Sequence, residues 1–283
     1  MKTAFVLVFA AAAGLVIGCA GNAPLPPKAA ELNDQGAKAL ADDDLEHAEA
    51  KIALALEYNP RFTEAWVNLG LIELRRGRIT EAEHDFRKAE ELNPDLPAPF
   101  HALGLLEERR GRLEKAEEDY RAALRVDPGF GPARVNLGRL LFARQAFAEA
   151  REQFLRLTEV APQVIEGWTG LCESLMRLGR THEADEILDQ ARDKLGERPQ
   201  LVLLVARRLL RQGEIDAALA ALGPITHDQN DAMASAAWAW TAVANAQKGD
   251  ASAARTAAER ALSLDPQNRV ALFAQKQAQQ TKN

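Results

Sequence analysis

The chain has 283 residues, with 41 acidic against 35 basic side chains and a formal net charge of −6. An acidic chain without a long basic run is poorly suited to nucleic-acid binding, and two cysteines cannot form the disulfide framework of a small secreted domain. Charged residues make up 27% of the chain and proline falls in patches, which is typical of helices rather than of sheet.

The first predicted element is an apolar run from Ala4 to Ile17, preceded by Lys2. It is too short for a membrane-spanning helix, which needs about 20 residues, but it matches the hydrophobic region of a secretory signal. The run leads through Gly18 to Cys19, and this order resembles the lipobox of bacterial lipoproteins. The resemblance implies a signal peptide over residues 1–18 and lipidation of Cys19, which becomes the new N-terminus. The alternative is a secreted protein in which this cysteine has no special role.

A short tether is predicted after the cysteine. Residues 19–30 contain Pro24, Pro26 and Pro27 and little apolar pattern, so we expect an extended spacer. In the lipoprotein family an aspartate after the cysteine retains the product at the inner membrane, and this sequence has Ala20 there. The resemblance therefore implies the periplasmic face of the bacterial outer membrane, with the lipid as the only membrane contact.

A repeat of 34 residues fills most of the remaining chain. Its clearest matched pairs are Leu69 and Leu103, Gly70 and Gly104, Gly77 and Gly111, Ala82 and Ala116, Phe86 and Tyr120, Ala89 and Ala123, and Pro94 and Pro128. This spacing and this pattern resemble the tetratricopeptide repeat, a helical hairpin. Such hairpins stack into a right-handed superhelix because none can bury its apolar face alone. We therefore expect an all-α solenoid of about seven hairpins and a C-terminal capping helix.

The period also predicts boundaries: repeats one to five over residues 31–198, degenerate repeats six and seven over 199–267, and the capping helix with a tail over 268–283. Position twenty, where the two helices of a hairpin cross, is alanine in every predicted repeat: Ala48, Ala82, Ala116, Ala150, Ala184, Ala218 and Ala254. Glycines recur where the first helix turns into the second, and we expect a left-handed backbone at each of them: Gly77, Gly111, Gly179, Gly213 and Gly249.

The sixth repeat departs most from the pattern. Val205 and Ala206 replace its leucine–glycine pair, and the segment 223–231 interrupts its second helix. Solenoid repeats contact only their neighbours, so residues 223–234 are a candidate hinge. The alternative is sequence drift in a repeat that still packs normally, and the sequence leaves both open.

No constellation of catalytic residues occurs. The five histidines include no H-E-x-x-H pair, and the acidic stretch 182–186 is expected to be the solvated start of a second helix. The glycines of 129–134 follow no strand, and no nucleophile motif is present. Cys172 stands at a small-residue position of the repeat, which predicts a packed, inert thiol. We predict no enzymatic activity, no cofactor and no bound metal.

The family resemblance implies that partners bind the concave face, which is lined by first-helix side chains. It selects Val67, Leu71, Leu74, His101, Leu105, Val135, Arg139 and Phe142. The alternative for the leucines is packing within the solenoid. Recurring arginines at the ends of first helices favour helix-dipole stabilisation over ligand contact: Arg75, Arg109, Arg177 and Arg211.

Two further features bear on the ligand. Asn68 and Asn136 match asparagine positions of the family's carboxylate clamp, but its lysines are absent, so an extended peptide or an amphipathic helix is the expected partner. Three tryptophans fall on a packing position, whereas Trp240 lies off that pattern and is a candidate exposed contact.

The order of lipobox, short tether and repeats resembles pilotin and Tad-type pilus-assembly lipoproteins. This implies a scaffold that helps to assemble a secretion or type IV/Tad pilus machine. The alternative, also met among repeat lipoproteins, is an adaptor that recruits or regulates peptidoglycan hydrolases or other envelope enzymes. The sequence does not identify the partner or the oligomeric state.

We expect Cys19→Ser to release the protein from the membrane fraction, because the sequence offers no other apolar anchor and stable anchoring takes more than one acyl chain, which a triacylated cysteine supplies. Cell fractionation with a salt wash measures this. A variant that still pellets with membranes would place the anchor elsewhere. Wild-type protein that travels with inner-membrane markers in a density gradient would contradict the outer-membrane prediction.

Overall fold

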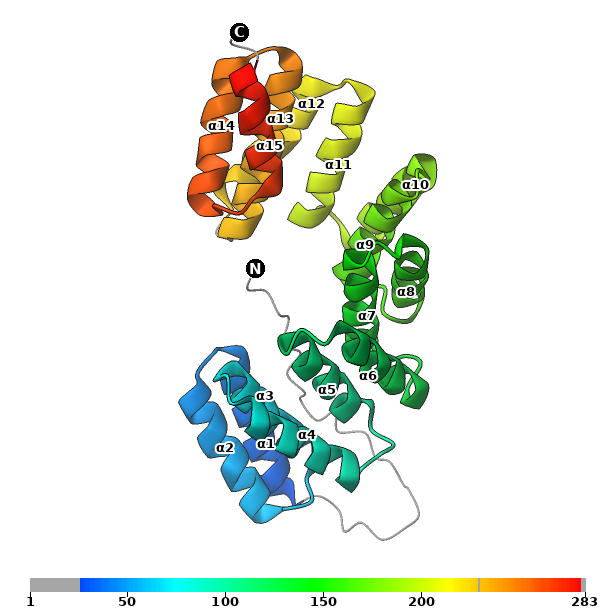
Figure 1. Cartoon of the computed structure of the whole chain (residues 1–283), viewed down its shortest axis with the longest axis vertical. Coiled ribbons are helices and arrows are strands. Elements are labelled where there is room, and N and C mark those ends of the chain that lie inside the picture. Colours follow the sequence, from blue (N-terminus) through cyan, green and yellow to red (C-terminus); the bar gives the residue numbers. More distant parts are fainter. Residues whose placement is uncertain (1–25, 229, 281–283) are drawn as a thin grey trace. The chain divides into compact units, whose positions relative to one another are not determined.

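The computed structural model describes residues 26–228 and 230–280. The predicted signal peptide, the lipidation site Cys19 and the first part of the tether lie outside these residues, as do residue 229 of the candidate hinge and the last three residues of the tail. The described part is built from helices and contains no strand (Figure 1), so the predicted all-α class is confirmed.

The helices alternate as first and second members of hairpins. The first helices are α1 (Pro27–Ala41), α3 (Thr63–Arg75), α5 (Pro97–Arg109), α7 (Gly131–Ala143), α9 (Ile165–Arg177), α11 (Pro199–Gln212) and α13 (Asp231–Lys248). The second helices are α2 (Leu45–Tyr58), α4 (Ile79–Leu92), α6 (Leu113–Val126), α8 (Phe147–Val160), α10 (Thr181–Leu195), α12 (Ile215–Leu222) and α14 (Ala251–Leu264). A 3₁₀ helix, η1 (Gly223–His227), follows α12, and α15 (Arg269–Gln280) ends the described chain. The chain divides into two compact units at residues 144 and 145, so that α1–α7 form the first unit and α8–α15 the second.

The alanines at position twenty are all buried, as predicted, although α8, which carries Ala150, packs on α9 within the second unit. Each of the seven is at most 3% exposed. Position eight of the first helix is glycine in the first four repeats. A Cβ atom added to Gly70 would lie 2.5 Å from the ring of Phe86, and one added to Gly36 would lie 2.6 Å from Ile52. The large side chain of the second helix therefore occupies the space that a first-helix side chain would need.

In the fifth and sixth repeats the residue at position eight is larger than glycine, and the facing residue of the second helix is smaller than an aromatic ring. Position eight is Cys172 in the fifth repeat, and the facing residue of α10 is Leu188 rather than an aromatic. In the sixth repeat Ala206 and Leu222 share one core cluster. A larger residue on one helix thus accompanies a smaller one on the other, as close packing requires. In the sixth repeat, the alanine at position eight is therefore matched by a leucine on the second helix.

The turn between the two helices has a left-handed residue at position fifteen. The five glycines predicted there have φ between 74° and 85°. The sequence analysis missed Asp43 and Gln145, which adopt the same conformation at φ 61° and 63° without being glycine. A Cβ atom is disfavoured in this conformation, so both turns carry local strain.

One boundary differs from the sequence prediction. Helix α1 begins at Pro27, inside the range expected for the tether, because proline is favoured in the first turn of a helix and Ala29 is already buried in the core. The second helix of the sixth repeat ends at Leu222, where the sequence predicted its interruption, and η1 continues from it. Ile225 of η1 is 6% exposed and packs in the core cluster of α11–α13, so η1 is anchored within the second unit.

Ion pairs join neighbouring repeats of the first unit at a fixed spacing. Arg76 bonds Glu49 at 2.6 Å, Arg110 bonds Glu83 at 2.5 Å, and the third pair is Arg144 with Glu117. In each case position fourteen of one repeat meets position twenty-one of the preceding one. The three pairs hold α3, α5 and α7 against the second helix before them.

We expect Ala116→Leu to lower the free energy of unfolding by about 1–3 kcal/mol, because a larger side chain overpacks the crossing of α5 and α6. Circular dichroism should show a lower melting temperature with helicity retained in the cold. The matched control is Lys115→Leu, an exposed position on the same helix that should leave the melt nearly unchanged. Equal melts for both variants would contradict the crossing described here.

Candidate partner-binding surface

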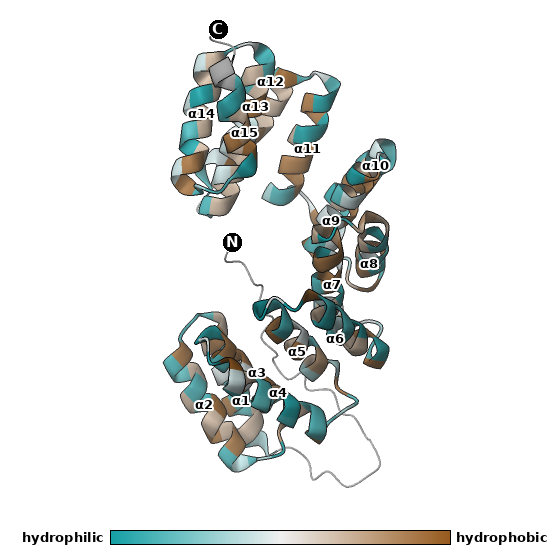
Figure 2. Cartoon of the chain, in the orientation of Figure 1, coloured by the Kyte–Doolittle hydropathy of each residue, from teal (hydrophilic) through white to brown (hydrophobic). Residues whose placement is uncertain are grey.

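The predicted groove residues fall on α3, α5 and α7 of the first unit, where Figure 2 shows apolar and polar residues mixed along the helices. Three of them are not available to a partner. Val67, Leu71 and Val135 are 0%, 3% and 8% exposed. These side chains fill the interior because the neighbouring first helix packs over them, which corrects their assignment to an open groove.

Of the other five, His101 is also buried and Leu74 packs against the core cluster of α1–α5, whereas three retain an accessible surface. Leu105 is half-buried and packs on the core cluster of α1–α5, Phe142 is half-buried, and Arg139 is exposed. We call Leu105, Arg109, Arg139 and Phe142 the α5–α7 surface. Glu108 lies beneath it, and burial raises the pKa of its carboxyl group although the nearby Arg139 opposes this shift.

The two asparagines that match clamp positions are committed to contacts inside the fold. Asn68 donates its amide hydrogen to Asn33 Oδ1 at 2.9 Å, and both residues are 0% exposed. Asn136 Nδ2 lies 2.8 Å from Nε2 of the buried His101. Each pair joins position five of one repeat to position six of the next. The predicted absence of a carboxylate clamp therefore has a structural reason: these amides hold neighbouring first helices together.

His101 is held neutral. Its ring lies 5.7 Å from the rings of Tyr120 and Phe130, and burial lowers its pKa from 6.5 to about 3. Because Asn136 donates to Nε2, the ring proton is assigned to Nδ1. The imidazole is a structural hydrogen-bond acceptor, which the sequence analysis had placed in the groove lining.

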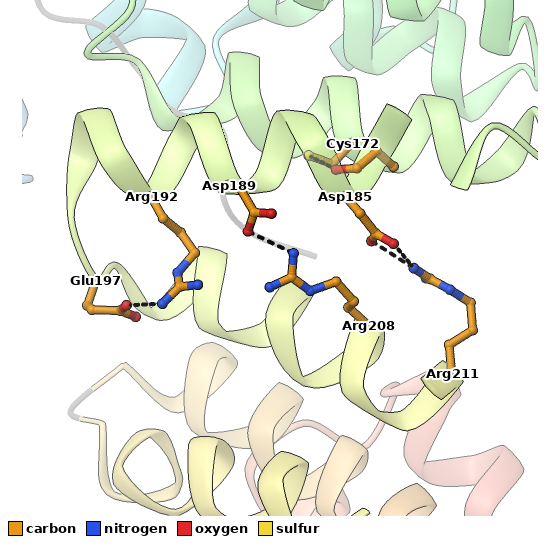
Figure 3. A network of polar contacts seen from close by, with 8 residues as sticks. Cys172, Asp185, Asp189, Arg192, Glu197, Arg208 and Arg211 are labelled. Carbon is orange, nitrogen blue, oxygen red and sulfur yellow. Dashed lines mark hydrogen bonds and ion pairs between the residues drawn. The ribbon is translucent and has the colours of Figure 1, made fainter. Parts of the chain in front are cut away.

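Three of the four recurrent arginines have partners within the chain. Arg75 bonds Asp43 at 2.5 Å, and the Arg177 guanidinium lies 4.8 Å from the ring centre of Phe147. Figure 3 shows Arg211 of α11 directed at Asp185 of α10, with two contacts of 2.7 and 2.9 Å, beside the pair Arg208–Asp189. The structure therefore gives these side chains specific partners in addition to any effect of the helix dipole.

Arg109 is exposed and has no polar partner among the described residues. The positions that supply partners elsewhere explain this. Arg75 bonds Asp43, which lies 32 residues before it, but the residue 32 before Arg109 is Gly77. Arg211 bonds Asp185, which lies 26 residues before it. The residue 26 before Arg109 is Glu83, whose carboxylate already bonds Arg110. Arg109 therefore adds a free cation to the α5–α7 surface.

The tryptophans support the fold. Trp66 and Trp168 donate their indole N–H groups to the carbonyl oxygens of Pro60 and Pro162, at 2.9 and 2.8 Å. Trp240 is only half-exposed. It packs in the core cluster of α11–α13 under the guanidinium of Arg207, which lies 5.2 Å from its ring centre. The prediction that Trp240 is an exposed contact for a partner is therefore not supported by its packing.

Cys172 is packed in the interior, and His182 and Glu186 are solvated, as the sequence predicted. Cys172 is 1% exposed, its thiol lies 3.5 Å from the carbonyl oxygen of Ala184, and burial raises its pKa to about 12. His182 and Glu186 form a solvated pair with side chains 89% and 59% exposed. Among the described residues no group of three or more His, Cys, Asp or Glu could hold a metal ion, and none of the described helices is long and apolar enough to cross a membrane.

Models of the tetratricopeptide repeat match residues 63–96, 109–175 and 203–269, together more than half of the chain. The chain belongs to the tetratricopeptide repeat family. No curated protein matches it. Proteins of this family are generally non-enzymatic scaffolds for protein–protein interaction, and the fold supports that general role here.

Solved structures share the fold at low identity. A tetratricopeptide repeat protein from Parabacteroides merdae ATCC 43184 is 18% identical, with a TM-score of 0.62 over 90% of this chain and 100% of its own. PilF of Pseudomonas aeruginosa is 20% identical, with a TM-score of 0.62 over 77% of this chain and 97% of its own. The Cut9–Hcn1 assembly of the APC/C contains a chain that is 15% identical, with a TM-score of 0.57 over 89% of this chain and 42% of that one. These similarities show the fold alone.

We expect the neutral His101 to make the protein less stable in mild acid. Its folded pKa is about 3 against 6.5 in the unfolded chain, so the unfolded state binds the extra proton between these values and the contribution of His101 to stability falls as the pH drops below 6.5. From pH 7.5 to pH 5 this amounts to about 2 kcal/mol. His101→Gln, which keeps a hydrogen-bonding side chain, should remove this loss in denaturant titrations at the two pH values. His182→Gln, at an exposed position, should retain it, and an equal pH dependence in both variants would contradict the assignment.

Proposed function

We propose that this protein is a non-enzymatic scaffold, lipid-anchored through Cys19 to the periplasmic face of the bacterial outer membrane, that binds a protein partner on the α5–α7 surface. Its proposed role is to assist assembly of a secretion machine or a type IV/Tad pilus. The partner segment would be an extended peptide or an amphipathic helix.

The observation that carries the binding proposal is the composition of the α5–α7 surface. Most first-helix side chains of the first unit are consumed by packing between repeats, whereas Leu105 and Phe142 remain partly accessible beside the exposed Arg139. Phenylalanine and arginine are both enriched in protein–protein interfaces. Arg109 and Arg139 are two cations against the single half-buried Glu108, which favours a partner segment with acidic groups.

The proposed anchor would hold the start of α1 close to the membrane. Seven residue steps separate Cys19 from Pro26, the first described residue. An extended chain of this length spans at most about 25 Å. The solenoid would therefore begin near the lipid surface, and a bound partner would be held at the membrane. The fold shared with PilF agrees with this proposal at the level of architecture only.

Affinity capture from solubilised envelope tests the cellular role. Recovery of secretin or pilus subunits with wild type, and their loss with a surface variant, would support the proposal. Recovery of peptidoglycan hydrolases in the same surface-dependent way would favour the adaptor role over the assembly role.

We expect the double variant Leu105→Glu, Phe142→Glu to lose its partner while the protein keeps its fold. Both side chains are partly solvated in the free protein, but a bound partner would have to bury two unpaired carboxylates, which is costly. The readouts are capture of the partner and thermal unfolding of the same preparation.

The matched control for this variant is Leu54→Glu, Tyr58→Glu on α2, which adds the same charge at side chains that are 40% and 56% exposed. A stable surface variant that retains every partner would exclude the α5–α7 surface. A lower melting temperature for Leu105→Glu, Phe142→Glu would show that these two residues belong to the core. Loss of the partner in the α2 control would move the binding site to the first hairpin.

A further inference from the structure

Helix α15 continues the repeat. The seventh repeat has Ser235 at position one, and α15 begins 34 residues later, at Arg269. Asn268 caps α15 by accepting from the N–H groups of Val270 and Ala271, and its own amide donates to the hydroxyl of Ser235 at 2.9 Å. In Figure 1, α15 lies against α13 and α14. It therefore has the place of the first helix of an eighth hairpin.

One face of α15 is buried in the expected way. Ala271 and Ala274 are 0% and 1% exposed and pack against alanines of α13 and α14. The adjacent face is open, and Figure 2 shows apolar colour on this helix between polar ends. Leu272 is 45% exposed and Phe273 is 59% exposed, at positions four and five of the repeat.

These two positions are covered everywhere else. In the seven repeats before α15, no residue at position four or five is classed as exposed. The contacts show what covers them. Trp66 at position four faces His84 of its own second helix, with ring centres 6.3 Å apart. His101 at position five meets Tyr120 of its second helix and Asn136 of the next first helix. A second helix is thus the natural cover for Leu272 and Phe273, and none follows α15 among the described residues.

Position eight of α15 limits how a covering helix can lie. The earlier repeats have glycine, cysteine or alanine there: Gly36, Gly70, Gly104, Gly138, Cys172, Ala206 and Ala242. Helix α15 has Lys276 instead. A lysine does not permit the tight crossing that Gly70 and Phe86 make, but its ammonium group can pair with an acidic residue on a helix that crosses at a greater distance.

The charge of α15 distinguishes between two occupants. The helix carries Arg269 and Lys276 and contains no acidic residue. Two copies packed through α15 would bring these cations together without a counter-charge, which is unfavourable. A helix of another protein that carries carboxylates beside its apolar face would satisfy both the exposed side chains and the lysine.

We propose that α15 is a docking site for an acidic amphipathic helix of a partner protein, which packs on Leu272 and Phe273, pairs a carboxylate with Lys276 and so completes an eighth hairpin between two chains. The site is separate from the α5–α7 surface, so either proposal can fail without the other.

The chain itself supplies a probe for this site. Helix α10 carries five acidic and two basic residues. It packs on α9, whose position eight is Cys172 rather than glycine. A fluorescently labelled peptide of residues 181–195 should bind the full chain in an anisotropy titration. The matched control peptide has Glu183→Gln, Asp185→Asn, Glu186→Gln and Asp189→Asn, and it should bind more weakly.

Variants of the protein then locate the binding. The double variant Leu272→Glu, Phe273→Glu should raise the Kd of the acidic peptide at least tenfold, with an unchanged melt because both side chains are exposed. Lys276→Glu keeps the apolar pair and should weaken the acidic peptide while it improves the control peptide. Absence of binding to wild type, or binding that none of these variants alters, would overturn the proposal. Concentration-dependent dimers in sedimentation experiments that Phe273→Glu abolishes would assign the face to a second copy instead.

Discussion

The close crossing of paired helices is the constraint on which the rest of this structure depends: in most repeats the first helix crosses the second, and in the second unit α8 crosses α9. At this point an alanine of the second helix faces a small residue of the first, so that the two backbones approach closely. The large side chain one turn further along the second helix then enters the space that the missing first-helix side chain leaves. Because interiors are packed to a fixed density, a change on one helix requires the opposite change on the other. The repeats obey this rule with different residues: Gly70 with Phe86, Cys172 with Leu188, and Ala206 with Leu222.

The crossing also decides which side chains remain for binding. Once the hairpins are closed, neighbouring first helices come near enough that positions five and six meet, and the polar pairs Asn33–Asn68 and His101–Asn136 are sealed inside. Much of the face that the family uses for ligands is thus occupied by contacts between repeats. What remains is a small surface on α5 and α7, in which Arg109 is free because the acids that pair with its counterparts are either absent or already bonded.

The same constraint explains the end of the chain. Helix α15 repeats the packing of a first helix on the preceding hairpin through Ala271 and Ala274, but Lys276 stands where a close crossing needs a small residue. Among the described residues no second helix follows α15, and the side chains that such a helix would cover are exposed. A helix that ends a stack in this way leaves an apolar face whose natural complement is another helix.

The sequence by itself determined the repeat, and with it the all-α fold, the alanine crossings and the left-handed turns at glycine, because these depend on residues that recur every 34 positions along the chain. It also indicated the inert Cys172 from its place in the repeat. It could not show that Val67, Leu71 and Val135 are core rather than groove, that Asp43 and Gln145 take a glycine conformation, or that Arg109 alone of the recurrent arginines lacks a partner. Each of these depends on how closely one repeat lies against the next. That distance is set by side chains about 26 to 35 residues apart, so only the tertiary structure could decide which first-helix residues are buried and which are free to bind.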